Sequence, residues 1–331
     1  MQFTTILLHW YEENKRSLPW RGERDVYKVW VSEIILQQTR IQQGWDYYLR
    51  FIEAFPDVRA LAEADEEAVL RVWQGLGYYS RARNMHAAAQ SIMTQHQGIF
   101  PPDYDGIRAL KGIGDYTAAA ICAFAYGLPY PAVDGNVLRI ISRVFGIHDN
   151  IMLNDTKKKI TALCKKILAD VNPADFNQAL MDFGSLQCVP KNPDCEKCPL
   201  RDECYAFKEQ KVDFLPVSIK NVNIKKRYFH FLFYTEKQKF FIEQRTGNDI
   251  WKGLYQLPLI ETDNDKTLNY KILHKTKHQL THQSIEAVFY QIENAKDLPK
   301  SKRQYEVIGI EERSQYAFST LIVNFFEKIG I

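Results

Sequence analysis

The chain has 331 residues, of which 46% are hydrophobic and 25% are charged, and its net charge is +3. This composition is typical of a globular protein with room for two domains, and the near balance of charge excludes DNA binding through an overall positive field. The longest apolar run, residues 118–128, is too short to cross a bilayer, and the N-terminus lacks a signal-peptide core. We therefore expect a cytoplasmic protein of the bacterial cytosol or nucleoid, without a membrane partner.

The first two-thirds of the chain has the apolar periodicity of helices. One helix is predicted to begin at Asp115 or Tyr116. The others are predicted over residues 3–16, 26–55, 58–64, 66–74, 82–95, 105–110, 135–145, 155–170 and 173–186.

Glu33 is the unusual residue of the predicted helix 26–55. Apolar residues lie three or four positions from it, so the carboxyl shares a largely apolar face. A carboxylate desolvated in this way has a raised pKa and can hold a proton near neutral pH. The alternative is a glutamate that is ion-paired at the edge of the core.

A glycine-bounded turn, Gly75-Leu76-Gly77, precedes Tyr78, Tyr79 and Arg81. Exposed aromatic rings beside an arginine are suited to stacking on bases or wedging between them. The alternative is a pair of core tyrosines.

Gly112-Ile113-Gly114 lies between two helical patterns. Two glycines around one apolar residue let the backbone turn tightly and direct N–H groups outward, toward an anion such as a phosphate. Asp134 begins a later helix in a polar loop, where it is suited to remain ionised. The alternatives are an ordinary turn between helices and an ordinary helix cap.

Four clustered cysteines close the helical region, with six, two and five residues between successive members. Clustered thiols in a chain without a secretory signal favour a metal centre over disulfides, and zinc is the most general occupant of such a site. The remaining Cys122 and Cys164 lie in apolar patterns and are predicted to be buried.

The last third of the chain changes to a strand-type composition after a polar connector. Strands over residues 228–234 and 239–244 are predicted to form a β-hairpin. Further strands are expected over residues 270–276, 284–291 and 305–309, with a final helix over 316–329.

Taken together, these motifs resemble the endonuclease III superfamily of base-excision DNA glycosylases, and within it the MutY-type adenine DNA glycosylases. The resemblance covers nearly the whole chain. The residues that carry it are Leu18-Pro19-Trp20, Ser32-Glu33, Leu36-Gln37-Gln38-Thr39, Gly75-Leu76-Gly77-Tyr78-Tyr79, Arg81-Ala82-Arg83, residues 110–117, Val133-Asp134-Gly135-Asn136-Val137, Met181-Asp182-Phe183-Gly184 and the four cysteines.

The resemblance implies a multidomain protein. An all-α helix-hairpin-helix glycosylase domain would span residues 1–208, with an iron-sulfur cluster loop at 188–204. A connector, 209–226, would join it to a smaller α+β, Nudix-like lesion-recognition domain over 227–331. One 4Fe-4S cluster, rather than zinc, would be held by Cys188, Cys195, Cys198 and Cys204.

The implied function is base-excision repair by a hydrolase that removes adenine paired with 8-oxoguanine or guanine in double-stranded DNA. We expect a monomer. Breaking the N-glycosidic bond needs an acid for the leaving base and a negative charge beside the sugar cation. Glu33 would protonate adenine and then activate water, and Asp134 would stabilise the cation, because their surroundings are expected to separate their pKa values.

The resemblance assigns further residues to the site. Tyr116 would lie beside the reaction centre, and Asn136 would support the Asp134 loop. Relatives of the endonuclease III type carry a Schiff-base lysine where this chain has Tyr116, so a monofunctional enzyme is expected. The residues expected to contact DNA are Gly112, Gly114, Gln37, Gln38, Tyr78, Arg21 and Arg81.

The C-terminal part resembles the Nudix-like domain of the same family, which senses 8-oxoguanine. No Arg-x-x-x-Glu-Glu helix is evident, so nucleotide hydrolysis is not expected. The family signature Phe-Ser-His is replaced by Leu280-Thr281-His282, which keeps the hydroxyl and the imidazole but loses an aromatic contact. Thr281 and His282 are therefore the expected lesion-recognition residues. The alternative for His282 is a strand histidine that faces solvent.

Two other functions are weighed against this one. A bifunctional glycosylase for oxidised pyrimidines is disfavoured by Tyr116 and by Gly135-Asn136. A DNA-binding module that recognises lesions without catalysis is disfavoured by the presence of both Glu33 and Asp134.

Overall fold

The computed structural model describes residues 2–219, 224–301 and 304–331. Its contacts divide the chain into two compact units. The helical unit comprises Met1–Ala62 and Ala87–Lys220, and the sheet unit comprises Glu63–His86 and Asn221–Ile331. Residues 220–223, within the predicted connector, lie outside the described residues. The predicted domain boundaries stay a prediction.

Helices form the chain up to residue 208, as predicted. No helix within the described residues is long and apolar enough to cross a membrane. The elements are α1 (Gln2–Asn14), α2 (Val26–Leu36), α3 (Ile41–Ala54), α4 (Val58–Glu63), α5 (Glu66–Trp73), α6 (Ser80–Gln95), α7 (Tyr104–Ala109), α8 (Asp115–Tyr126), α9 (Gly135–Phe145), α10 (Asn154–Leu168), α11 (Pro173–Leu186), η1 (Arg201–Glu203) and α12 (Tyr205–Lys208).

The predicted single helix over 26–55 is wrong, because the chain breaks between α2 and α3 at residues 37–40. Gln38 adopts a positive φ of 55°, which a helix does not permit. Gly44 in α3 lies against Leu36, and a Cβ built at Gly44 would approach Leu36 Cδ2 to 2.9 Å. The break therefore places Gln37 and Gln38 in an irregular turn at the end of α2.

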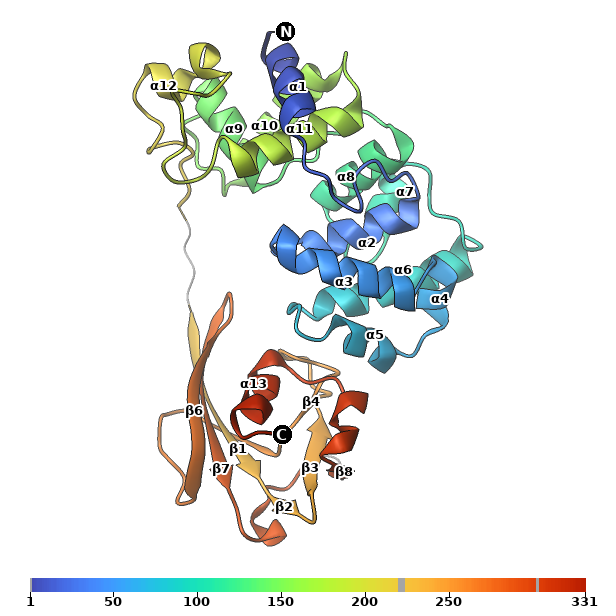
Figure 1. Ribbon diagram of the computed structural model, residues 1–331, viewed down its shortest axis with the longest axis vertical. Coiled ribbons are helices and arrows are strands. Elements are labelled where there is room, and N and C mark those ends of the chain that lie inside the picture. The colour runs from blue at the N-terminus through green and yellow to red at the C-terminus, as the bar shows by residue number, and fades with distance from the viewer. Residues whose placement is uncertain (1, 220–223, 302–303) are drawn as a thin grey trace. The chain divides into compact units, whose positions relative to one another are not determined.

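A large apolar core joins α1, α9, α10 and α11, which lie together in Figure 1. Local signals define two of these helices. Asn172 caps α11 by accepting from the N–H groups of Ala174 and Asp175, and Pro173 occupies the first turn. Gly146 ends α9 in the left-handed region, at φ 67°. Helix α2, which carries Glu33, packs on α3 and on α8. Helix α8 carries Tyr116.

The sheet unit contains two four-stranded sheets. The first has the order β5-β1-β7-β6, with β1 parallel to β7 and antiparallel to β5. In the second, β3 pairs with β2, β4 and β8. The strands are β1 (Lys225–Phe233), β2 (Thr235–Glu236), β3 (Lys239–Gln244), β4 (Tyr255–Gln256), β5 (Leu259–Thr262), β6 (Lys271–Gln279), β7 (Gln283–Gln291) and β8 (Glu306–Gly309), with short helices η2 (Ala295–Asp297) and η3 (Glu311–Gln315).

The predicted hairpin between the first two long strands is wrong in its pairing. The hairpin partner of β3 is the two-residue β2, and the turn is made by Lys237 and Gln238, both with positive φ. Strand β1 instead pairs over its whole length with β7. Strand β5 was not predicted, because its four residues carry too short a pattern.

Helix α13 (Thr320–Lys328) packs against both sheets, between which it lies in Figure 1. The Phe325 ring stacks on Phe289 of β7 at 4.0 Å, and Phe326 contacts Phe240 of β3. Two adjacent aromatic residues therefore join the sheets into one core.

Candidate active site

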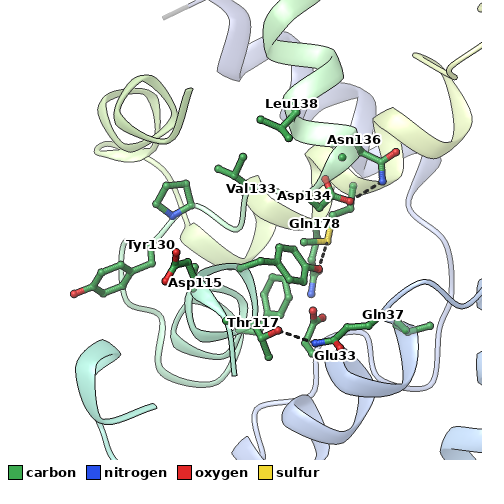
Figure 2. Close-up of a pocket in the computed structure, with 18 of the residues that line it drawn as sticks. Glu33, Gln37, Asp115, Thr117, Tyr130, Val133, Asp134, Asn136, Leu138 and Gln178 are labelled. Carbon is green, nitrogen blue, oxygen red and sulfur yellow. Dashed lines mark hydrogen bonds between the residues drawn. The ribbon is translucent and has the colours of Figure 1, made fainter. Parts of the chain in front are cut away.

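A cleft of about 1580 Å³ opens in the helical unit. It is lined by α2, the turn before α8, the start of α9, and faces of α10 and α11. Six basic and four acidic side chains border it. Figure 2 shows Glu33 directed toward the turn that carries Asp134.

Glu33 lies on α2, whose side chains are buried on almost every position. Only 7% of Glu33 is exposed. Burial raises the pKa of Glu33 to about 7, with the Tyr116 hydroxyl hydrogen bond lowering it and the nearby Asp134 charge raising it. The carboxyl can therefore hold a proton near neutral pH, as the apolar spacing predicts.

Asp134 caps α9 and is also half-buried in the cleft. Its Oδ1 accepts from the Val137 N–H at 2.8 Å, and its Oδ2 accepts from Asn136 Nδ2 at 2.8 Å. The expectation of a polar setting is corrected here, because burial raises the pKa of Asp134. The donors from Val137 and Asn136, together with Arg139, oppose that rise and favour the ionised form.

Tyr116 lies in the first turn of α8 and lines the same cleft. Burial raises the pKa of its hydroxyl well above the usual value, and the Glu33 and Asp134 charges add to the effect. The group is thus a neutral hydroxyl that can donate to Glu33. Its oxygen also lies 4.0 Å from Met181 Sδ of α11.

Arg139 was not singled out from the sequence, although it completes the Asp134 site. Its Nη2 donates to Asn136 Oδ1 at 2.9 Å and to the Gly184 carbonyl at 2.6 Å, and its Nε donates to the Cys188 carbonyl at 2.8 Å. A hydrogen-bonded chain thus runs from Asp134 to the first cysteine. Arg139 follows Asn136 by three positions on a largely buried helix, and this spacing alone predicts that the two side chains can interact.

The glycine turn before α8 differs in detail from the prediction. Gly112 requires glycine, at φ 83°, whereas Gly114 is extended, at φ −95°, and is the N-terminal cap of α8. A Cβ at Gly114 would meet no atom within 4 Å. Both glycines line the cleft, so the open space at Gly114 lies where an external group can approach the backbone.

Gln37 and Gln38 end α2 at the edge of the cleft. Gln37 Nε2 donates to Thr117 Oγ1 at 3.1 Å, a contact drawn in Figure 2. Gln38 is exposed. Arg21 also lines the cleft, where its Nη2 bonds both oxygens of the buried Asp182 at 2.9 and 3.0 Å and its Nη1 bonds Tyr11, and its contact with DNA stays a prediction.

The sheet unit holds the other predicted contact residues. Tyr78 is 48% exposed, whereas Tyr79 is buried and donates to the Phe318 carbonyl. The Tyr78 hydroxyl lies 2.9 Å from Thr281 Oγ1. Thus one of the two tyrosines is a core residue, and the other is presented beside the predicted lesion-recognition hydroxyl.

The Arg81 guanidinium packs over the Trp73 and Tyr78 rings, and burial lowers its pKa to about 10. Contact of Arg81 with DNA stays a prediction. Thr281 and His282 are both exposed in the turn that joins β6 to β7, so His282 is not a strand residue.

The four predicted metal-binding cysteines border one small cavity of about 20 Å³ in the helical unit. All are free thiols, and Arg143 Nη1 lies 3.4 Å from Cys188 Sγ. Within the described ranges, no three histidine, cysteine or acidic groups are placed to hold a metal ion. Cys122 and Cys164 are fully buried, as predicted.

Comparison with known proteins identifies the family. Residues 31–170 match the HhH-GPD superfamily of base excision DNA repair proteins, and residues 229–328 match the NUDIX domain. The adenine DNA glycosylase of Buchnera aphidicola subsp. Schizaphis graminum is 34% identical over 289 residues, covering 87% of this chain and 83% of that protein. The chain belongs to the adenine DNA glycosylases.

Solved structures support the same fold for the helical part of this adenine DNA glycosylase. A thermostable thymine-DNA glycosylase superposes with a TM-score of 0.59 at 27% identity, covering 63% of this chain and 96% of that one. A trapped endonuclease III–DNA covalent intermediate gives 0.53 at 20% identity, covering 62% and 94%. The helical glycosylase fold followed by a Nudix-like domain is therefore confirmed.

Proposed function

We propose that this adenine DNA glycosylase excises adenine paired with 8-oxoguanine, and also with guanine, from double-stranded DNA. The observation that carries the proposal is that Glu33 and Asp134 line one cleft, which Tyr116 also lines. A pKa of about 7 leaves Glu33 protonated on a large fraction of molecules at neutral pH. It donates that proton to the leaving base and then accepts one from the attacking water.

Asp134 supplies negative charge beside the sugar cation. Its donors Asn136 and Val137 hold both carboxylate oxygens, which fixes the charge in the place where positive charge develops. The target base reaches the pair by leaving the base stack. Gln37, Gln38 and Tyr78 are proposed to contact the duplex from which the base has left, and Gly112 and Gly114 are proposed to present backbone N–H groups to phosphate.

A single-turnover assay tests this function. Duplexes carrying adenine opposite 8-oxoguanine, guanine or thymine are incubated with excess enzyme, alongside Glu33→Gln and Asp134→Asn. We expect adenine release from the first two duplexes and losses of about a hundredfold or more in both variants. Absence of release from every duplex, or full activity in both variants, refutes the proposal.

We further propose a monofunctional reaction, because Tyr116 offers no amine to the sugar. Borohydride treatment during turnover is expected to trap little covalent DNA complex. Lys157, Lys158 and Lys165 also line the cleft, so any weak trapped species is to be compared with variants of these lysines. A robust trapped complex that survives those changes contradicts the proposal.

The four cysteines are proposed to hold one 4Fe-4S cluster. Four free thiols that border one cavity can bind either such a cluster or a single zinc ion, and the family resemblance favours the cluster. The cluster would organise the loop that follows α11. An anaerobic absorbance spectrum with iron and sulfide assays distinguishes the two, and bound zinc without iron contradicts this assignment.

A further inference from the structure

We propose that one face of α10 is a second DNA phosphate-binding wall of the catalytic cleft. The face comprises Asn154, Lys157, Lys158, Thr161 and Lys165, which are spaced so that they lie on the same side of the helix. All five line the cleft that contains Glu33 and Asp134. The inference rests on the proposed function, because it extends the DNA-binding surface of the same site.

The lysines of this face have no acidic partner among the residues that the structure describes. Within the described part of the chain, Lys157, Lys158 and Lys165 form no ion pair, whereas Lys159, which does not line the cleft, is paired with Asp149 at 2.7 Å. Three ammonium groups that line one cleft concentrate positive charge there, which attracts an external anion. The arrangement on α10 therefore favours a polyanion in the cleft.

The acidic residues of the cleft do not neutralise this wall. Asp182 is fully buried and bound by Arg16 and Arg21, and Asp115 is paired with Arg108 at 2.6 Å. Glu33 and Asp134 are the two remaining carboxyls of the cleft lining. The positive charge of α10 is thus available to the backbone of a bound strand.

Aromatic side chains extend the same wall. Tyr130 stacks on Tyr104 at 4.6 Å with the rings 15° from parallel, and Lys165 Nζ lies 6.0 Å from the Tyr130 ring. Both tyrosines line the cleft, whose lining also includes Gly112 and Gly114. Backbone N–H groups, lysines and a flat apolar surface are together the features that bind a nucleic-acid strand.

The test uses two double variants of the full chain with the same change in charge. Lys158→Ala/Lys165→Ala alters the proposed wall, and Lys159→Ala/Lys166→Ala alters the same helix away from the cleft. Affinity for a fluorescent, undamaged duplex is measured between about 50 and 200 mM salt, where each lost phosphate contact lowers the slope of log K against log salt by about 0.9. Thermal unfolding confirms that both variants fold.

We expect the wall variant to bind more weakly than wild type, and we expect the slope of log K against log salt to be smaller in magnitude by about 2. The ratio of wild-type affinity to variant affinity therefore falls by about tenfold between about 50 and 200 mM salt. The control variant is expected to match wild type. Equal slopes for wild type and the wall variant, or equal losses in both variants, overturn the inference. Adenine release by wild type is scored separately, so a failure of the proposed function does not affect the binding result.

Discussion

Tyr78 and Thr281 are 203 positions apart in the chain, yet their hydroxyl oxygens lie 2.9 Å apart within the sheet unit. The contact joins the exposed tyrosine before α6 to the turn between β6 and β7. That turn is held in place by the backbone, because the His282 carbonyl accepts from Lys225 N–H of β1 at 3.0 Å. The predicted wedge residue and the predicted lesion-recognition residue therefore lie side by side on one surface of the sheet unit.

Replacing Thr281 by valine keeps the side-chain shape and removes the hydroxyl. We expect the preference for 8-oxoguanine over guanine opposite adenine to fall by about fivefold, because one hydrogen bond contributes roughly 1 kcal/mol of discrimination. The ratio of single-turnover rate constants on the two duplexes measures it. Thr276→Val, on strand β6 of the same hairpin, is the matched control. An unchanged ratio in Thr281→Val shows that this hydroxyl does not read the lesion.

The pH dependence of excision follows from Glu33. The acid must be protonated, and its pKa is about 7, so the rate constant is expected to fall toward tenfold per pH unit as pH rises above about 7. Single-turnover rate constants at saturating enzyme, measured between about pH 5 and pH 9, test this decrease at high pH. A rate that rises steadily through this range contradicts an acid role for Glu33.

Glu33 also has a cost in stability. A carboxyl whose pKa is raised from 4.5 in the unfolded chain to about 7 in the folded protein destabilises the fold progressively as pH rises between these values. The full cost, about 3 kcal/mol, applies above pH 7. Glu33→Gln is therefore expected to raise the unfolding temperature at pH 8 but not near pH 4.5. The exposed Glu13→Gln is the control, and a Glu33→Gln variant no more stable than wild type at pH 8 contradicts the expected burial cost.

The contrast between Glu33 and Asp134 shows what the sequence could predict. The surroundings of Glu33 are set by neighbours three or four positions away on one helix, so local spacing predicts its raised pKa. Asp134 is buried by contacts distant in sequence. Gly184 of α11 packs so closely on Asn136 that an added Cβ would come within 2.5 Å of it. Such packing leaves no periodic signal.

The same distinction explains the errors in the fold. Helices capped by local residues, such as α9 and α11, were predicted with their observed bounds. The break after α2 carries neither a proline nor a glycine that would mark it, and the parallel pairing of β1 with β7 depends on residues distant in sequence instead. Arg139 was missed for that reason too, since its acceptors Gly184 and Cys188 are more than a full helix away along the chain.

Arg139 is expected to position Asn136 and, through it, Asp134. Arg139→Lys cannot reproduce three directed hydrogen bonds, so we expect single-turnover excision to fall by about tenfold or more while DNA affinity stays close to wild type. Arg143→Lys is the comparison variant, because Arg143 is also buried on α9 and bonds the carbonyls of Val189, Pro190 and Leu215 and the Cys188 sulfur without contacting Asn136. Equal losses of rate in both variants would contradict the positioning role of Arg139, because they would come from the loop at residues 188–190 that both arginines contact.

Glycine at position 114 is expected to be required for DNA binding but not for the stability of the fold. Its φ of −95° suits any residue, and an added Cβ meets no protein atom within 4 Å. Gly114→Ala is thus expected to keep the unfolding temperature of wild type while weakening binding to undamaged duplex, because the methyl group enters the space through which a phosphate approaches the N–H groups of α8. Gly112→Ala is the contrasting variant. Its φ of 83° is unfavourable for alanine, so it is expected to lower stability by about 1 kcal/mol. Wild-type affinity in a stable Gly114→Ala protein would remove this turn from the DNA-binding surface.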